Sequence, residues 1–159
     1  MQDRCSHFVD NAAFGIRLPK LFVSRMGQHM SNAQHSPIRI LVVEDEFLIR
    51  LTLSEALGDE GFEVLEAETG DDALPMLQAD SGIRLLLTDI QLPGKLNGHA
   101  LAQRVRQTLP DLPVIFMTGR LEQDVGAPAS PLDVFISKPY TLTAICDAAK
   151  RLTGAQTPG

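Results

Sequence analysis

From residue 38 to residue 152, short and nearly continuous apolar runs alternate with longer stretches that repeat apolar residues at helical spacing. The runs are typical of strands buried on both faces of a parallel sheet, and the stretches are typical of helices that cover such a sheet. We expect strands over 38–43, 62–67, 85–89, 114–117 and 133–137, and helices over 46–58, 71–78, 98–109 and 141–152. Strands that alternate with helices predict an α/β fold with one doubly wound, five-stranded parallel sheet.

Two stretches depart from this pattern. Pro75 has to lie in the first turn of helix 71–78 or bend it, because proline has no backbone N–H. Between the fourth and fifth strands only Leu121 and Val125 are spaced like one face of a helix. We expect the helix in this segment to be short or degraded, at most two turns long. The residues that interrupt it are Gly126, Pro128 and Pro131.

Helix 46–58 carries apolar side chains on two sides when its residues are plotted at 100° each. One side consists of Ile49, Leu53, Ala56 and Leu57, and the other of Phe47, Leu48 and Leu51. We expect the first side to pack on the sheet. The second side, with Leu48 and Leu51 foremost, is then available to bind a partner.

The pattern divides the chain into a tail over 1–36, a domain over 37–153 and a tail over 154–159. Residues 1–36 have no sustained period and are too few to hold a core of their own. Either translation starts at Met30 and the residues before it are not part of the protein, or they are a real but disordered extension. Because only a few small and polar residues follow 153, we expect no output domain.

Composition narrows the classes of function. The formal net charge is −6, with 14 Lys and Arg against 20 Asp and Glu, so we expect no nucleic-acid partner. Cys5 and Cys146 match no metal-ligand spacing and make a poor disulfide framework, which suits a reducing cytoplasm. No apolar run approaches the roughly 18 residues of a membrane span, and no signal peptide is evident. We therefore expect a soluble, cytoplasmic protein.

Reactive side chains stand where the expected strands end. Glu44 and Asp45 follow the first strand, Asp89 ends the third, Thr118 follows the fourth, and Lys138 follows the fifth. Ligands bind outside the carboxyl ends of the strands in open parallel sheets, so these groups should meet at one edge. Like charges about 4 Å apart repel by about 4 kcal/mol at an effective dielectric of 20. The carboxylates therefore require a cation, and oxygen ligands of this kind favour Mg²⁺.

This arrangement also suits phosphoryl transfer. A carboxylate such as Asp89 can act as the nucleophile and form an aspartyl phosphate. The step is catalysed mainly by positioning and by neutralising charge on the transferred group. A divalent ion, the ammonium of Lys138 and the hydroxyl of Thr118 could supply that neutralisation.

The ordered motifs Val42-Val43-Glu44-Asp45, Asp89, Thr118-Gly119 and Lys138-Pro139 resemble the receiver domain of bacterial response regulators in two-component signalling. The resemblance covers about residues 38–152. It implies a flavodoxin-like sheet with strand order 2-1-3-4-5. It also implies a phosphoprotein that takes a phosphoryl group from a sensor histidine kinase or a histidine phosphotransferase, assists its own phosphorylation and dephosphorylation, and is not otherwise an enzyme.

The resemblance assigns a role to each site residue. Asp89 is the phosphoacceptor, Asp45 binds Mg²⁺ directly, and Glu44 acts partly through water. The backbone carbonyl of Gln91 is a further metal ligand, Thr118 and Lys138 hold the phosphoryl oxygens, Thr118 and Phe135 form the switch, and the peptide bond to Pro139 is cis. Phe116-Met117-Thr118-Gly119 is also similar to the Phe-Ala-Thr-Gly motif of alphaproteobacterial stand-alone receivers.

Three features depart from the commonest family pattern. The loop from Asp89 to Gly98 is one residue longer, the fourth helix is degraded, and Phe135 stands where tyrosine is frequent. These departures leave a second hypothesis open, a receiver-fold module that binds proteins without phosphorylation. A third hypothesis, a flavin-binding protein of the same architecture, is disfavoured because Glu44-Asp45-Glu46 would repel a phosphate.

Simpler roles exist for each residue taken alone. Glu44 and Asp45 could cap the following helix, Lys138 could be a solvated surface charge, and Pro139 could start a helix. Together, the strand-end positions favour a common site. We expect His99 to be a surface residue and Cys146 a small core residue.

Overall fold

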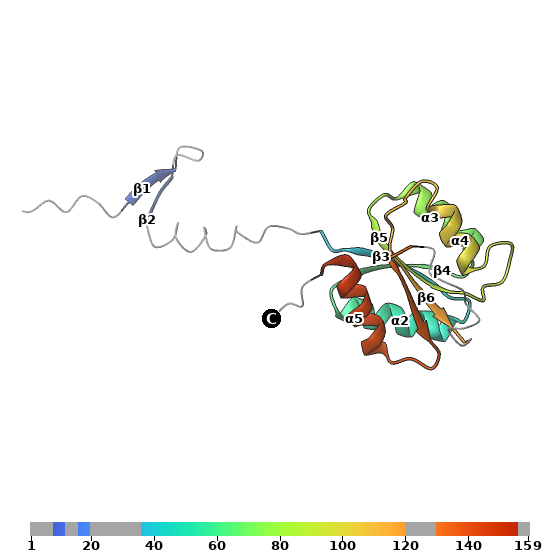
Figure 1. The fold of residues 1–159 in the computed structure, drawn as a ribbon. Coiled ribbons are helices and arrows are strands. Elements are labelled where there is room, and N and C mark those ends of the chain that lie inside the picture. Colours follow the sequence, from blue (N-terminus) through green and yellow to red (C-terminus); the bar gives the residue numbers. More distant parts are fainter. Residues whose placement is uncertain (1–7, 12–15, 20–35, 120–129, 156–159) are drawn as a thin grey trace, which may run out of the picture. The chain divides into compact units, whose positions relative to one another are not determined.

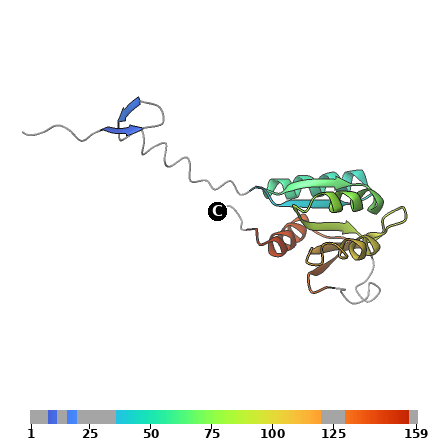
Figure 2. The same ribbon diagram turned by 90° about the horizontal axis from the view of Figure 1, so that it is seen from above.

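The computed structural model describes residues 8–11, 16–19, 36–119 and 130–155. The chain separates into two compact units, Met1–Ser36 and Pro37–Gly159. In the first unit, β1 (Phe8–Asn11) pairs antiparallel with β2 (Ile16–Pro19), and Figures 1 and 2 show the two strands side by side. The sequence predicted no regular element in this tail, so the pair is a correction. Each strand has only four residues, the shortest length over which a strand pattern can be recognised.

The second unit is built on a parallel five-stranded sheet with the order β4-β3-β5-β6-β7 (Figure 1). Its strands are β3 (Arg39–Val43), β4 (Glu63–Ala67), β5 (Ile83–Asp89), β6 (Val114–Thr118) and β7 (Asp133–Ser137). Counted within this unit, the order is 2-1-3-4-5. The predicted α/β fold and strand order are therefore confirmed.

The helices lie on both faces of this sheet (Figure 1), and the hydrophobic core therefore has two parts, one on each face. The helices are α2 (Phe47–Asp59), α3 (Gly70–Ala79), α4 (Gly98–Val105) and α5 (Leu142–Thr153). Leu41 and Val43 of β3 pack in the cluster that includes α3 and α4, whereas Ile40 and Val42 pack in the cluster that includes α2 and α5. Alternate residues of one strand thus enter opposite cores, as the continuous apolar runs predict.

The two sides of α2 are confirmed by burial. Leu53 and Leu57 are 1% and 0% exposed, whereas Phe47 and Leu48 are 61% and 72% exposed. In α5, helical spacing puts Leu142 on one face with Ile145 and Ala149, but Leu142 is 39% exposed while the other two are buried. It is the first residue of its helix.

Two helix boundaries differ from expectation. Pro75 lies in the second turn of α3, not in the first. α4 ends at Val105, and a turn follows in which the N–H of Leu109 still donates to the carbonyl of Val105 at 2.8 Å. The expected short helix between β6 and β7 falls largely outside the described residues. No described helix is long and apolar enough to cross a membrane.

Candidate functional site

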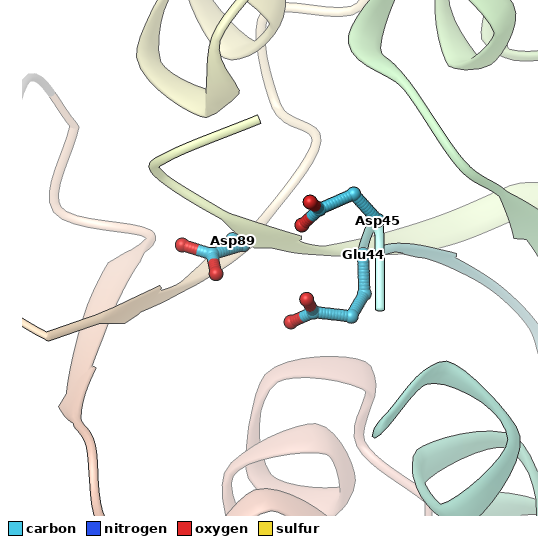
Figure 3. Close-up of side chains that lie close together, drawn as sticks. All are labelled: Glu44, Asp45 and Asp89. Atoms are coloured by element: carbon cyan, nitrogen blue, oxygen red, sulfur yellow. The ribbon is translucent and has the colours of Figure 1, made fainter. Parts of the chain in front are cut away.

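The carboxyl ends of neighbouring strands bring Glu44, Asp45 and Asp89 together. One carboxylate oxygen from each residue lies within 4.8 Å of the others. Figure 3 shows the side chains of Glu44 and Asp45 extending from the end of β3 toward Asp89 at the end of β5. Because β3 and β5 are adjacent and parallel, residues 44 places apart in sequence share one edge of the sheet. The expected convergence is thus present.

Glu44 is almost completely enclosed, with 1% of its surface exposed. Its Oε1 accepts from the backbone N–H of Glu46 at 3.3 Å, and its Oε2 lies 3.4 Å from Nζ of Lys138. Burial raises the pKa of Glu44 and the charge of Asp89 adds to this, while the ammonium of Lys138 opposes it. A further cation beside this carboxylate would therefore be favourable.

Asp89 is 6% exposed, and each of its carboxylate oxygens has a donor. Oδ1 accepts from the backbone N–H of Gln91 at 2.9 Å, and Oδ2 forms an ion pair with Nζ of Lys138. Burial lowers the pKa of Lys138, but the hydrogen bond to Asp89 and the charge of Glu44 outweigh it and the net shift is upward. Lys138 is therefore an ammonium held between two carboxylates.

The segment around Lys138 has the expected backbone. The Lys138–Pro139 peptide bond is cis, and the N–H of Lys138 donates to the carbonyl of Thr118 at 2.6 Å. Thr118 is 2% exposed at the end of β6, whose neighbours are β5 and β7. The order of the strands thus places Thr118 at the strand end between those that lead to Asp89 and to Lys138.

Phe135 belongs to an aromatic cluster that the sequence did not predict as a whole. Its ring stacks on Phe116 with centroids 4.9 Å apart, and His99 of α4 lies 4.8 Å from Phe116 and 6.0 Å from Phe135. His99 is partly buried and contacts both rings, so the expectation of a surface residue holds only in part. Phe116 and Phe135 are partners in the pairing of β6 with β7. The sequence held one indication of this cluster: Phe116 and Phe135 are each the third residue of their strands. His99 is the second residue of α4, which packs on the same face of the sheet.

The loop after Asp89 is held by neighbours that sequence reasoning missed. Oδ2 of Asp71, in the first turn of α3, accepts from the backbone N–H of Lys95 at 2.8 Å. A Cβ on Gly98 would lie 2.2 Å from the carbonyl oxygen of Asp89, and Gly94 has φ of +99°. Only glycine fits both positions, because one approaches backbone closely and the other is left-handed. The long loop is thereby closed tightly over the end of β5.

The donor set suits a hard divalent cation. Glu44, Asp45 and Asp89 offer carboxylate oxygens only, which Mg²⁺ and Ca²⁺ prefer over nitrogen or sulfur. Lys138 balances only part of their combined negative charge. Asp45 is exposed, so a hydrated ion has access from solvent. The backbone N–H of Gln91 donates to Asp89. The backbone carbonyl of Gln91, which the resemblance implies as a further metal ligand, belongs to the same loop.

Comparison with known proteins agrees with the family that the sequence resembles. A family model for the response regulator receiver domain matches residues 40–150. The response regulator protein FleR of Pseudomonas aeruginosa is 32% identical over 123 residues, which are 76% of this chain and 26% of FleR. The sensor kinase CckA of Brucella abortus is 31% identical over 121 residues, 74% of this chain and 13% of CckA. The chain thus spans a minor part of both relatives.

Solved structures extend the agreement to the fold. A response regulator receiver protein from Sinorhizobium medicae superposes with a TM-score of 0.70 at 26% identity, covering 76% of this chain and 97% of that one. The receiver domain of the hybrid histidine kinase CckA superposes with a TM-score of 0.62 at 31% identity, covering 72% and 98% of the two chains. With the acidic cluster and Lys138 at the edge of a 2-1-3-4-5 sheet, these matches show that the chain belongs to the receiver domain family of two-component response regulators.

Proposed function

We propose that the chain is a Mg²⁺-dependent phosphoacceptor, in which Asp89 takes a phosphoryl group from a histidine kinase or a histidine phosphotransferase. The observation that supports it most directly is the convergence of Glu44, Asp45 and Asp89 within 4.8 Å, with Nζ of Lys138 on Asp89. The attacking carboxylate and one ammonium are then side by side, and the remaining negative charge of the carboxylates requires a divalent cation.

In this mechanism a carboxylate oxygen of Asp89 attacks the phosphorus of a phosphohistidine. The new O–P bond forms as the P–N bond breaks, and the imidazole leaves with the bonding electron pair. Lys138, now paired with Asp89, moves its ammonium to an oxygen of the phosphoryl group, and the hydroxyl of Thr118 donates to another. Asp45, Asp89, the Gln91 carbonyl and in part Glu44 would hold Mg²⁺, which would supply neutralisation of charge on the transferred group.

The product is an acyl phosphate, which water can hydrolyse at the same site. The chain therefore assists its own phosphorylation and dephosphorylation and does not turn over a separate substrate. We propose that the phosphorylated domain acts by binding a protein partner or by passing the phosphoryl group along a relay. Thr118 and the Phe135 cluster are the elements that would register the modification, because Thr118 lies at the site and Phe135 one strand away.

The phosphodonor protein has a suitable surface beside the site. A groove of about 410 Å³ lies between α2 and the segment after β7 and is open to solvent. Leu48 and Thr52 of α2 and Pro139, Tyr140 and Leu142 line it, with Lys138 at its site end. A partner helix seated there would bring a phosphohistidine next to Asp89, which is the geometry that transfer requires.

The test is phosphorylation by a small donor. Incubation of the full chain with acetyl phosphate and Mg²⁺ should add one phosphoryl group by intact mass, and a chelator or Asp89→Asn should abolish the addition. Asp111→Asn is the matched control, since Asp111 is exposed in the loop before β6, at the opposite end of the sheet. Labelling that persists in Asp89→Asn would refute the assignment. Failure of the unaltered chain to label would favour the phosphorylation-independent binding module.

A further inference from the structure

The turn that carries the acidic pair is not fixed by an ordinary helix cap. α2 begins after Glu46, whose side chain makes no capping hydrogen bond, and its first turn contains no acidic residue among those described. A helix start of this kind leaves the preceding turn without its usual anchor. The N–H of Glu44 donates to the carbonyl of Ala67, and the N–H of Glu46 donates to Oε1 of Glu44. These bonds leave the backbone carbonyls of Glu44 and Asp45 to other donors, although both residues depend on that turn for their direction.

Arg50, one turn into α2, supplies that anchor. Its Nη1 donates to the backbone carbonyl of Glu44 and lies 3.4 Å from that of Asp45. Its Nε lies 3.4 Å from Oε2 of Glu66, at the end region of β4, and its side chain is only 11% exposed. The guanidinium carbon is 5.8 Å from the centre of the Phe47 ring, within the range of a cation–π contact. The guanidinium is thus fixed by contacts around it.

We propose that Arg50 is a positioning residue for Glu44 and Asp45, and through them for the divalent metal ion. The inference rests on the proposed function, because it concerns the same acidic site. The direction of a backbone carbonyl depends on the dihedral angles that also aim the side chain on either side of it. By holding the carbonyls of both residues, Arg50 keeps both carboxylates turned toward Asp89.

Removing a positioning residue and removing a mere neighbouring charge should change the affinity for Mg²⁺ in opposite directions. A cation close to a metal site repels a divalent ion, so removing a purely electrostatic Arg50 should tighten Mg²⁺ binding. Removing a positioning Arg50 should weaken it, because the ligands then have to be ordered at the moment of binding. A planar fork with several donors can serve two carbonyls at once, whereas a lysine ammonium is a point charge on a flexible stem.

The experiment is a calorimetric titration of the metal-free full chain with Mg²⁺, in parallel with thermal melts of the same samples. Arg50→Met and Arg50→Lys should both weaken Mg²⁺ binding, by about three- to tenfold. Glu66→Gln is the matched control. It removes the ion pair between Arg50 and β4 and leaves the hydrogen bonds from Arg50 to the backbone carbonyls, so the affinity of this variant for Mg²⁺ should stay within about twofold of that of the unaltered chain. The melts report any general loss of structure separately.

Several outcomes would overturn the inference. Tighter binding in Arg50→Met would show that Arg50 acts only as a charge, and unchanged binding would show that it has no part in metal binding. Normal binding in Arg50→Lys would show that any cationic donor at this position suffices. An equal loss in Glu66→Gln would assign the effect to the ion pair. If Arg50→Met does not fold, Arg50→Lys alone decides. Failure of the unaltered chain to bind Mg²⁺ would refute the proposed function, whereas equal binding by all variants would refute only the role of Arg50.

Discussion

The exposed side of α2 offers the sharpest test of how a phosphodonor protein reaches the site. Leu48 is 72% exposed and lines the groove that leads to Lys138. Full burial of a leucine side chain contributes about 1.5–3 kcal/mol, so covering the exposed part in a complex contributes about 1–2 kcal/mol. Since 1.4 kcal/mol is a factor of ten, losing this contact should slow transfer about five- to thirtyfold.

Leu48→Glu should reach or exceed the upper end of that range, because the complex would also have to bury a carboxylate. The assay compares kcat/KM for transfer from a phosphorylated kinase or phosphotransferase with the rate of labelling by acetyl phosphate. The first should fall and the second should stay unchanged, because acetyl phosphate needs no docking surface. Gln78→Glu is the control, since Gln78 is exposed on α3, which packs on the other face of the sheet.

The result that would refute this reasoning is an equal rate of protein-to-protein transfer in a Leu48→Glu variant that melts normally. The docking surface would then lie elsewhere. A variant that unfolds would contradict the exposure of Leu48 on α2.

Two further predictions concern stability. A chain that starts at Met30 should keep the melting temperature and labelling rate of the full chain, because a short two-stranded ribbon adds no core; a drop of many degrees would show that the tail stabilises the domain. Arg106→Met should lower the free energy of unfolding by about 3 kcal/mol or more, because it leaves the carboxylate of Asp133, 1% exposed, without its guanidinium partner. Urea denaturation measures this against Arg104→Met, an exposed arginine of α4, and equal midpoints for the two variants would contradict it.

Much of the site could be derived from the sequence because it depends on local pattern and strand order. An apolar run that ends in a carboxylate marks a strand end, and adjacent parallel strands bring such ends together. Glu44, Asp45 and Asp89 needed no further information to be placed in one cluster. Lys138 needed only the position of the last strand and the resemblance to receiver domains. The cis bond to Pro139 followed from that resemblance and is present.

Positions that depend on side-chain contacts could not be derived in this way. The sequence predicted His99 as a surface residue, because the local pattern does not show which rings from other elements it will contact. The rings of Phe116 and Phe135 beneath it decide its burial, and they come from two other elements. Leu142 shows the converse, since helical spacing groups it with buried residues of α5 and it is nevertheless 39% exposed at the first position of that helix.

The sequence by itself determined the alternation of strands and helices, the two apolar sides of α2, and the residue types at the strand ends, because these follow from periods of two and 3.6 residues. The tertiary structure alone decided which polar groups support the site. Arg50 holds the carbonyls before α2, and Asp71 holds the loop after Asp89 from another helix. Such bonds join particular atoms at particular distances, and no periodic pattern along the chain encodes which donor will find which carbonyl.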